Sequence, residues 1–584
     1  MNARIVSLLA GVTFLGLAAF VQGLLPLLEP QSRMPDVTKV VRTDLGELKW
    51  VRGESSDYTE LEQLGRDVYR REGCWYCHSQ YVRPVAREAQ RWGPVSQAGE
   101  YHWDKPHLWS TRRIGPDLTR VGLKFSDEWH IAHFWDPRMV VPDSIMPRFK
   151  ALFERPAERV AVITDDRGRR TLEANAVSER FFDFEEAENA ENEEVSNEIL
   201  LTPNAEGLLY VHEDNADFPL HGYPVIHTPN DEFDGDDVRI IGPTRELLGL
   251  VAYLQKLGMN RGMWRDVWEP QRVSAGHGNM PRSEAFIELG AEVYARRCVG
   301  CHGVEGDGNG PAATFHYIVR PRDFTFGAYK FRDTPSGSLP TDGDLLRVIN
   351  RGVRGTGMPS WHMLTQTDRL AVMQYIKYEL AVDRSDPDFP WAFFVEEEPA
   401  PPIWIGTPPE PSQALIEQGS EVWQFAECWE CHGDEGRGDG PRADELDDDF
   451  GFPILPADLT KGNFKSGPGV EDIFRSITTG LDGTPMPSHE DALDAQERWA
   501  VAYFVLSLSA FRDPLTGEPL EIAEEDRAAL NDPQLRAGTS RHAYVPEGVL
   551  VRRPGQETTP AERYAARRGI EIPEFGYRGG DAGD

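Results

Sequence analysis

Positive charge is scarce in this chain of 584 residues. Lysine and arginine together number 61 against 96 aspartates and glutamates, so the formal net charge is −35. A chain of this charge repels nucleic acid, and we expect no nucleic-acid partner. The charge would attract a basic soluble partner, but an acidic surface kept for solubility explains it equally well.

Long apolar runs are absent after the N-terminus, and the mean hydropathy of −0.48 is that of a soluble chain. The exception is the run 5–28, which contains no charged residue. As a helix it would span roughly 36 Å, enough for a hydrocarbon core of about 30 Å. Arg4 precedes the run and Glu29 ends it, so the positive-inside rule places the rest of the chain outside the cytoplasm. We therefore expect a single transmembrane anchor at 1–28 in the cell membrane, with periplasmic domains after it. A cleaved signal peptide is the alternative.

Cysteine is also rare, and its placement is informative. All six copies occur as C-x-x-C pairs, each followed at once by histidine: Cys74, Cys77 and His78; Cys298, Cys301 and His302; Cys428, Cys431 and His432. Disulfides and thioredoxin-like dithiols need no such histidine, and the pairs are too far apart for zinc knuckles. C-x-x-C-H is the attachment site of c-type haem, where both thiols bond to the haem and the histidine binds its iron. The sequence predicts three covalently bound c-type haems that exchange electrons.

A similar segment precedes each haem motif. A glycine is followed by an acidic residue, a valine and an aromatic residue at fixed spacing, beginning at Gly65, Gly290 and Gly419. This predicts one amphipathic helix used three times, with the valine and the aromatic residue packed inward and the glycine allowing a second helix to approach. Apolar spacing places that second helix at 247–257, 370–380 and 499–508, with Tyr253, Tyr375 and Tyr503 as the aromatic partners. Such crossed helices resemble the class I cytochrome c fold.

A Met-Pro pair lies between each haem motif and the second helix, at Met146, Met358 and Met486. Methionine is more often a flexible core filler than a ligand. Here Met358 and Met486 lie 17 residues before Tyr375 and Tyr503, and this shared register favours a sixth iron ligand. Met139 and Met363 are rivals that lack the proline. Histidine with methionine favours electron transfer over binding of oxygen or peroxide, so we assign no catalytic residue.

A Gly-Pro pair follows each haem motif, at Gly115-Pro116, Gly310-Pro311 and Gly440-Pro441. The prolines are candidates for the carbonyl that orients the haem histidine, and a plain loop turn explains them equally well.

The first unit contains an insertion of roughly 90 residues at about 150–242. Its acidic stretch at 183–198 is either disordered or a solvated face, and the strand-like runs 160–164 and 207–211 indicate a small β subdomain. We expect a mainly α fold in which the anchor is followed by cytochrome c domains at 29–260, 282–385 and 412–511. A Pro-rich linker lies at 386–411 and a charged tail at 512–584.

Four runs of the first unit are more specific than the haem motif. They read C-W-Y-C-H-S-Q-Y-V-R-P at 74–84, R-I-G-P-D-L at 113–118, S-D-E-W-H at 126–130 and V-P-D-S-I-M-P at 141–147. Together they resemble the mono-haem subunit (subunit II, FixO/CcoO type) of cbb3-type cytochrome c oxidases. The resemblance implies that His78 and Met146 are the axial ligands and that this haem passes electrons to the catalytic subunit.

The second and third units are similar to single-haem cytochrome c domains at large, without a clear match to the oxidase's separate di-haem subunit. The chain lacks the copper ligands and the many-helix membrane body of an oxidase. We expect a non-catalytic electron-transfer subunit that carries electrons from a soluble donor, such as a cytochrome c, through haems 2 and 3 to haem 1 and into the catalytic subunit of a haem–copper oxidase. A nitric oxide reductase subunit, a multihaem peroxidase and a tethered haem sensor are the alternatives.

Overall fold

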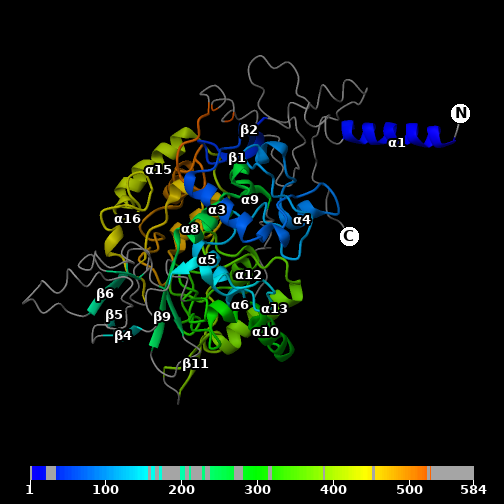
Figure 1. The fold of residues 1–584 in the computed structure, drawn as a ribbon. Helices are drawn as coiled ribbons and strands as arrows, with labels where there is room; N and C mark the ends of the chain where they lie inside the picture. The colour runs from blue at the N-terminus through cyan, green and yellow to red at the C-terminus, as the bar shows by residue number, and fades with distance from the viewer. Residues whose placement is uncertain are drawn as a thin grey trace, which may run out of the picture.

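The computed structural model is mainly helical with small sheets (Figure 1). It describes residues 3–21, 34–154, 237–268, 280–313, 319–385, 389–449 and 454–522, the strands between 160 and 229, and Arg527 and Leu530. Residues 183–197 of the predicted acidic stretch lie outside these residues, and so does the part of the predicted tail (512–584) that follows 522, apart from Arg527 and Leu530.

Helix α1 (Ala3–Ala19) corrects the prediction of a transmembrane anchor. Its 17 residues rise about 26 Å, less than the hydrocarbon core of about 30 Å. Within the described residues, no helix combines the length and the apolar character needed to cross a membrane. The prediction counted apolar residues over 5–28 without weighing helix propensity, although this run contains Gly23 and Pro26, the two poorest helix-forming residue types. Residues 22–33 lie outside the described part of the chain.

Three pairs of crossed helices form the body of the protein. They are α3 (Glu60–Arg71) with α8 (Arg245–Lys256), α10 (Glu284–Arg297) with α13 (Gln366–Tyr375), and α15 (Gln413–Phe425) with α18 (Ala495–Ser507). Helix α13 continues into a π-helical turn at Ile376–Leu380. Each pair has a hydrophobic core of its own, and the first helix of each pair is the repeated segment of the sequence.

Glycine sets the distance between the helices of each pair, as predicted. A Cβ on Gly65 would lie 1.7 Å from the Gly249 carbonyl oxygen, one on Gly290 2.2 Å from the oxygen of Ala371, and one on Gly419 2.1 Å from that of Ala500. Real Cβ atoms do not approach so closely, so only glycine allows the two backbones to touch here. The backbone contact fixes which residues of the second helix face the first.

The aromatic partners follow this contact, with one correction. Tyr69 meets Tyr253 and Tyr294 meets Tyr375, each with ring centroids 5.4 Å apart. In the third pair Trp423 meets Phe504 at 5.5 Å, so the prediction of Tyr503 is wrong. Tyr253 lies four residues after Gly249, which contacts Gly65, and Tyr375 lies four residues after Ala371, which contacts Gly290. Phe504 likewise lies four residues after Ala500, which contacts Gly419. The spacing argument was wrong by one residue because two aromatic residues are adjacent there.

Polar side chains define where several of these helices begin. Thr59 accepts from the Glu62 backbone N–H while Glu62 accepts from the Thr59 N–H, which closes a capping box at α3. Asp494 and Glu497 form the same arrangement at α18. Each box satisfies N–H groups that the first helical turn leaves without partners.

The strands form small sheets beside the helices. Strands β1 (Asp36–Arg42) and β2 (Leu48–Glu54) make an antiparallel hairpin, and Val41 and Val51 of this hairpin pack on Phe511 and Leu530. Strands β10 (Val382–Asp383) and β11 (Trp391–Ala392) make a second small pair. A sheet of order β3-β9-β4-β5-β6-β7, with β8 on β9, lies in the insertion; its bounds are β3 (Phe153–Glu154), β4 (Val160–Thr164), β5 (Arg170–Glu173), β6 (Glu198–Pro203), β7 (Leu209–Val211), β8 (Ile226–Pro229) and β9 (Asp237–Pro243).

Short helices carry the loops around the haem motifs. They are η3 (Cys74–Tyr76), α4 (Glu88–Trp92), η4 (Ala98–Tyr101), α5 (Asp127–Trp135), α6 (Pro137–Val140), η5 (Lys150–Leu152), η9 (Met259–Arg261), α9 (Trp264–Trp268), α11 (Val299–His302), α12 (Asp342–Arg351), α14 (Phe393–Glu396), α16 (Trp429–His432), η12 (Ala443–Glu445), η13 (Leu459–Lys461) and α17 (Val470–Thr479). The C-x-x-C-H motifs therefore follow directly on α3, α10 and α15.

Candidate haem sites

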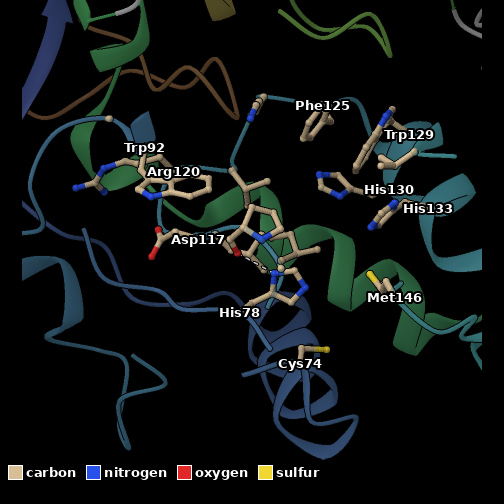
Figure 2. A pocket seen from close by; sticks show the side chains of 18 of the residues that line it. Cys74, His78, Trp92, Asp117, Arg120, Phe125, Trp129, His130, His133 and Met146 are labelled. Atoms are coloured by element: carbon tan, nitrogen blue, oxygen red, sulfur yellow. Dashed lines mark hydrogen bonds between the residues drawn. The ribbon is translucent and has the colours of Figure 1, made fainter. Parts of the chain in front are cut away.

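The first haem motif opens into a cavity of about 1340 Å³. Cys74, Cys77, His78 and Met146 all line it, and Figure 2 shows Met146 across the space from His78. The volume exceeds the roughly 300–1,000 Å³ of ordinary small-molecule pockets. Two thiols, an imidazole and a thioether around one large cavity are the donor set that a covalently attached haem requires.

His78 is oriented by a backbone carbonyl, as predicted for Pro116. Its Nδ1 donates to the Pro116 carbonyl oxygen at 2.8 Å, drawn as a dashed line in Figure 2. Because a carbonyl only accepts, Nδ1 carries the proton and Nε2 is left to bind iron. Burial lowers the pKa of His78, which keeps the ring neutral and its Nε2 lone pair available.

Asp117 holds the Pro116 loop in place. Its carboxylate accepts from the Ser79 hydroxyl at 2.5 Å, from the Thr119 N–H at 2.9 Å and from the Tyr81 N–H at 3.0 Å. These bonds connect the loop to the residues that directly follow His78, so the imidazole and its acceptor move together. The sequence contained this residue within the R-I-G-P-D-L run but gave no role for it.

In the other two sites the histidine faces a different carbonyl, and the prediction of Pro311 and Pro441 is wrong. His302 Nδ1 bonds to the Arg322 carbonyl oxygen at 3.1 Å. The Ala457 carbonyl raises the pKa of His432 against the larger lowering by burial, but no described residue makes a hydrogen bond to His432 Nδ1. The stretch from the histidine to this carbonyl is shorter in these units than the 38 residues of the first unit, and the Gly-Pro pair does not mark the acceptor.

The Gly-Pro glycines have a shared role that the sequence did not predict. The N–H groups of Gly115, Gly310 and Gly440 donate to the carbonyl of the second cysteine in their own motifs, at 3.0, 3.1 and 3.2 Å. A Cβ at Gly115 would lie 2.2 Å from Cε1 of the His78 ring. At Gly310 and Gly440 it would lie 2.4 Å from a backbone oxygen of the motif helix. Glycine is needed in all three places because the loop touches the haem motif directly.

All six cysteines are partly buried. Burial raises the pKa of Cys74, Cys298 and Cys301 to about 12 and that of Cys428 to about 11. Such thiols are protonated at neutral pH. They are suited to thioether bonds, which carry no charge into the core.

Met146 and Met486 lie where a sixth ligand is expected. Met146 packs in the same hydrophobic cluster as Cys74, and Met486 in the same cluster as Cys428. The rival Met363 is 64 % exposed to solvent. Met358 lines the cavity of the first unit, a position that the sequence gave no reason to expect. The six axial assignments remain predictions.

Two further histidines line the first cavity and were missed as site residues. Figure 2 shows His130 and His133 of α5 beside Met146. No described residue accepts from or donates to His130 Nε2 or His133 Nδ1. Burial lowers the pKa of His130 to about 3 and that of His133 to about 4, so both rings are neutral. Buried polar atoms normally have partners, and a haem with polar edges is the group that this cavity can accept.

The geometry of the sites agrees with the comparisons to known proteins. Residues 46–260 match the family described as cytochrome c oxidase, mono-haem subunit/FixO. Residues 285–376 match cytochrome c oxidase, cbb3-type, subunit III, and residues 416–509 match cytochrome c. The chain is a FixO-type unit joined to cytochrome c domains. The protein therefore has a haem electron-transfer role, and covalent c-type haem is its cofactor.

The match of the second unit corrects one expectation. Its sequence seemed to fit cytochrome c domains only in general, yet it matches a second subunit of the same oxidase. A solved chain of the reducing HAO-like protein complex of Kuenenia stuttgartiensis is 42 % identical and covers 40 % of this FixO-type chain and 99 % of its own length, with a TM-score of 0.36. No curated protein matches the chain.

Proposed function

We propose that this protein carries three haems and is the electron-transfer subunit of a cbb3-type haem–copper oxidase. Electrons enter from a soluble donor such as a cytochrome c, pass through haems 2 and 3 to haem 1, and leave for the catalytic subunit. The observation that carries the proposal is the FixO match of residues 46–260, the region in which Cys74, His78 and Met146 share one cavity.

The two oxidase matches support a division of labour between the haems. The FixO-type unit would contain the exit haem, and the second unit matches another subunit of a cbb3-type oxidase. One chain would then contain two components of the electron route, with the third haem domain added. The haem domains are proposed to lie on the extracytoplasmic side, where c-type haem is attached.

Each iron is proposed to be held by a histidine and a methionine: His78 with Met146, His302 with Met358, and His432 with Met486. When bound, the haem supplies one-electron redox chemistry. The carbonyls of Pro116 and Arg322 fix the imidazoles of His78 and His302, and the chain would supply a histidine and a methionine to each iron. Two filled axial positions favour electron transfer over binding of oxygen or peroxide.

Purification of the tagged chain from its native source tests the partner. Recovery of a cbb3-type catalytic subunit is the expected result, and a haemochrome assay should give three haems per chain. A stoichiometry other than three would contradict the tri-haem proposal. In Met146→Ala the haem should remain attached through its thioethers while its potential falls, and an unchanged potential would remove Met146 as a ligand.

A second candidate acceptor has an observation of its own. The 42 % identity to a chain of the reducing HAO-like protein complex covers 99 % of that chain. This protein would then carry electrons for an HAO-like enzyme instead of an oxidase. The same purification distinguishes the two, because an HAO-like subunit would be recovered in place of the oxidase subunit.

A further inference from the structure

The cavity of the first haem is not formed by the first unit alone. Arg351, Arg354, Met358, Ser360 and His362 line it as well, and all five belong to the second unit, between the end of α12 and the start of α13. The motif helix of the second unit lies against the first unit too, since a Cβ on Gly300 would lie 2.0 Å from the Met139 carbonyl oxygen. The two units therefore meet at their haem-bearing parts.

Arg354 reaches this cavity from a tight loop. The Val353 N–H donates to the Met358 carbonyl at 3.0 Å, the Thr356 hydroxyl donates to the Val353 carbonyl at 2.7 Å, and the Met358 N–H donates to the same hydroxyl at 3.1 Å. These bonds close the loop on itself around Arg354. The position of Arg354 is thus fixed together with that of Met358.

The charges around Arg354 leave room for an anion. Arg354 forms an ion pair with Asp266 of the first unit, and the same carboxylate lies 3.7 Å from Arg42. Arg265 lines the cavity beside them. Burial, followed by the neighbouring Arg265 and Arg42, lowers the pKa of Arg354 to about 9 against a smaller opposing effect of Asp472. Buried cations are stable when anions face them, and a haem brings two carboxylates.

We propose that Arg354 of the second unit binds a carboxylate of the haem held in the first unit. The inference rests on the proposed function, since it requires a haem at Cys74 and Cys77. The planar guanidinium suits this task because it can pair with two carboxylates or grip one with two parallel hydrogen bonds. Arg354 is then a positioning residue that acts across the boundary between the units. It joins the first haem to the loop of Met358, the predicted ligand of the second.

Redox titration of the full-length protein with its haems attached tests the proposal. Arg354→Gln removes a cation next to the first haem, which favours the oxidised iron and should lower the midpoint potential of that haem alone. Arg354→Lys keeps the charge and should restore most of the potential. Arg296→Gln is the matched control, since Arg296 is an exposed arginine of the same unit on α10. All three midpoints should be unchanged in the control.

A background variant identifies which haem responds. Met146→His should lower the potential of the first haem and separate its wave from the other two. Adding Arg354→Gln should then move this separated wave further down. A shift confined to the other waves, or a titration identical to that of Arg296→Gln, would overturn the inference. A haem count below three would instead contradict the proposed function, so the two failures are distinguishable.

Discussion

The first haem site and the other two are each built on a crossed helix pair of the same kind, but they differ in the loops that complete them. In all three a glycine brings two backbones into contact and an aromatic pair closes the crossing. The acceptor of the haem histidine is Pro116, next to Gly115, in the first site, whereas it is Arg322 in the second. The crossing is set by backbone contact and tolerates little change, while the loops around the haem can be rebuilt.

The first site differs again in what surrounds it. Its cavity is lined by His130 and His133, each with one ring nitrogen that has no hydrogen-bond partner among the described residues, and it is completed by side chains of the second unit. This suits a group that both units contact. A crossed helix pair is common to the three candidate sites, and the divergent loops allow the sites to differ from one another.

Substitution of the crossing glycines is the strongest test of the shared part. Gly65→Ala should lower the free energy of unfolding by about 3 kcal/mol, the upper end for overpacking, because its Cβ would lie only 1.7 Å from the Gly249 oxygen. Gly290→Ala and Gly419→Ala should lower the free energy of unfolding by less, since the added Cβ would lie 2.2 and 2.1 Å from the facing carbonyl oxygen. Urea unfolding followed by circular dichroism would rank the three variants by their free energy of unfolding.

Gly343→Ala in α12 is the control for these variants. The nearest atom to its Cβ would be the Thr341 hydroxyl at 3.5 Å, so no loss of stability is expected. If Gly65→Ala unfolded at the same urea concentration as Gly343→Ala, the backbone contact would not be what holds the helix pair together.

The absorption spectra of Gly115→Ala and Gly310→Ala should differ, because the two glycines contact different parts of their haem motifs. The new methyl group would lie 2.2 Å from the His78 ring and displace it, so one haem should gain a high-spin absorption. Gly310→Ala would meet the carbonyl oxygens of Val299 and Gly300 instead, which destabilises the motif helix by about 1–3 kcal/mol without touching the ring. Identical spectra for the two variants would contradict the difference between the sites.

How far the sequence predicts the structure depends on the kind of contact. The repeated glycine and aromatic positions predicted the crossed helices because such contacts obey a fixed helical register. Tyr503 was chosen in place of Phe504 because spacing alone cannot decide between adjacent aromatic residues. The anchor at 1–28 was predicted from apolarity alone, and α1 ends at Ala19. Helix length depends on propensity as well as on hydropathy.

The candidate sites divide in the same way. The cysteines and His78 are local motifs, and the sequence showed them directly. Arg322 and Ala457 meet their histidines only through the fold, so no local pattern marks them. His130 ended a recognised run and His133 lay just beyond it, and only the cavity shows that both line the first site. The domain boundaries and the axial methionines stay predictions.

The pH dependence of stability tests the surroundings of Lys330, which lies at the boundary between the second and third units. Burial, together with the nearby Arg322 and Lys465, lowers the pKa of Lys330 to about 7 from 10.5. Between pH 7 and 10.5 the unfolded chain therefore binds more protons than the folded one, and stability should rise with pH across this window. Lys330→Met should remove the rise and stabilise the protein at pH 7 and below, as urea unfolding at pH 6 and pH 9 would measure.

The exposed Lys105→Met is the control for that experiment and should change neither value. A Lys330→Met protein less stable than the wild type at pH 6 would show that an acidic group pairs with this lysine. The boundary would then resemble the one between the first and second units, where a haem carboxylate is proposed to face Arg354.

The smallest effect is expected from the surface ion pair that joins α3 and α8 in the first unit. Arg71 contacts both carboxylate oxygens of Glu246, at 2.7 and 2.6 Å, but the two side chains are 53 % and 42 % exposed. Exposed pairs contribute about 0.2–1 kcal/mol, so Glu246→Gln should lower the free energy of unfolding by less than about 1 kcal/mol, and less still at high salt. Glu60→Gln, which alters a longer pair with Arg245 at 3.5 Å, is the control and should have no effect. If Glu246→Gln cost as much as Gly65→Ala, the crossing in the first unit would depend on this ion pair, and the three helix pairs would not be held together by the same contact.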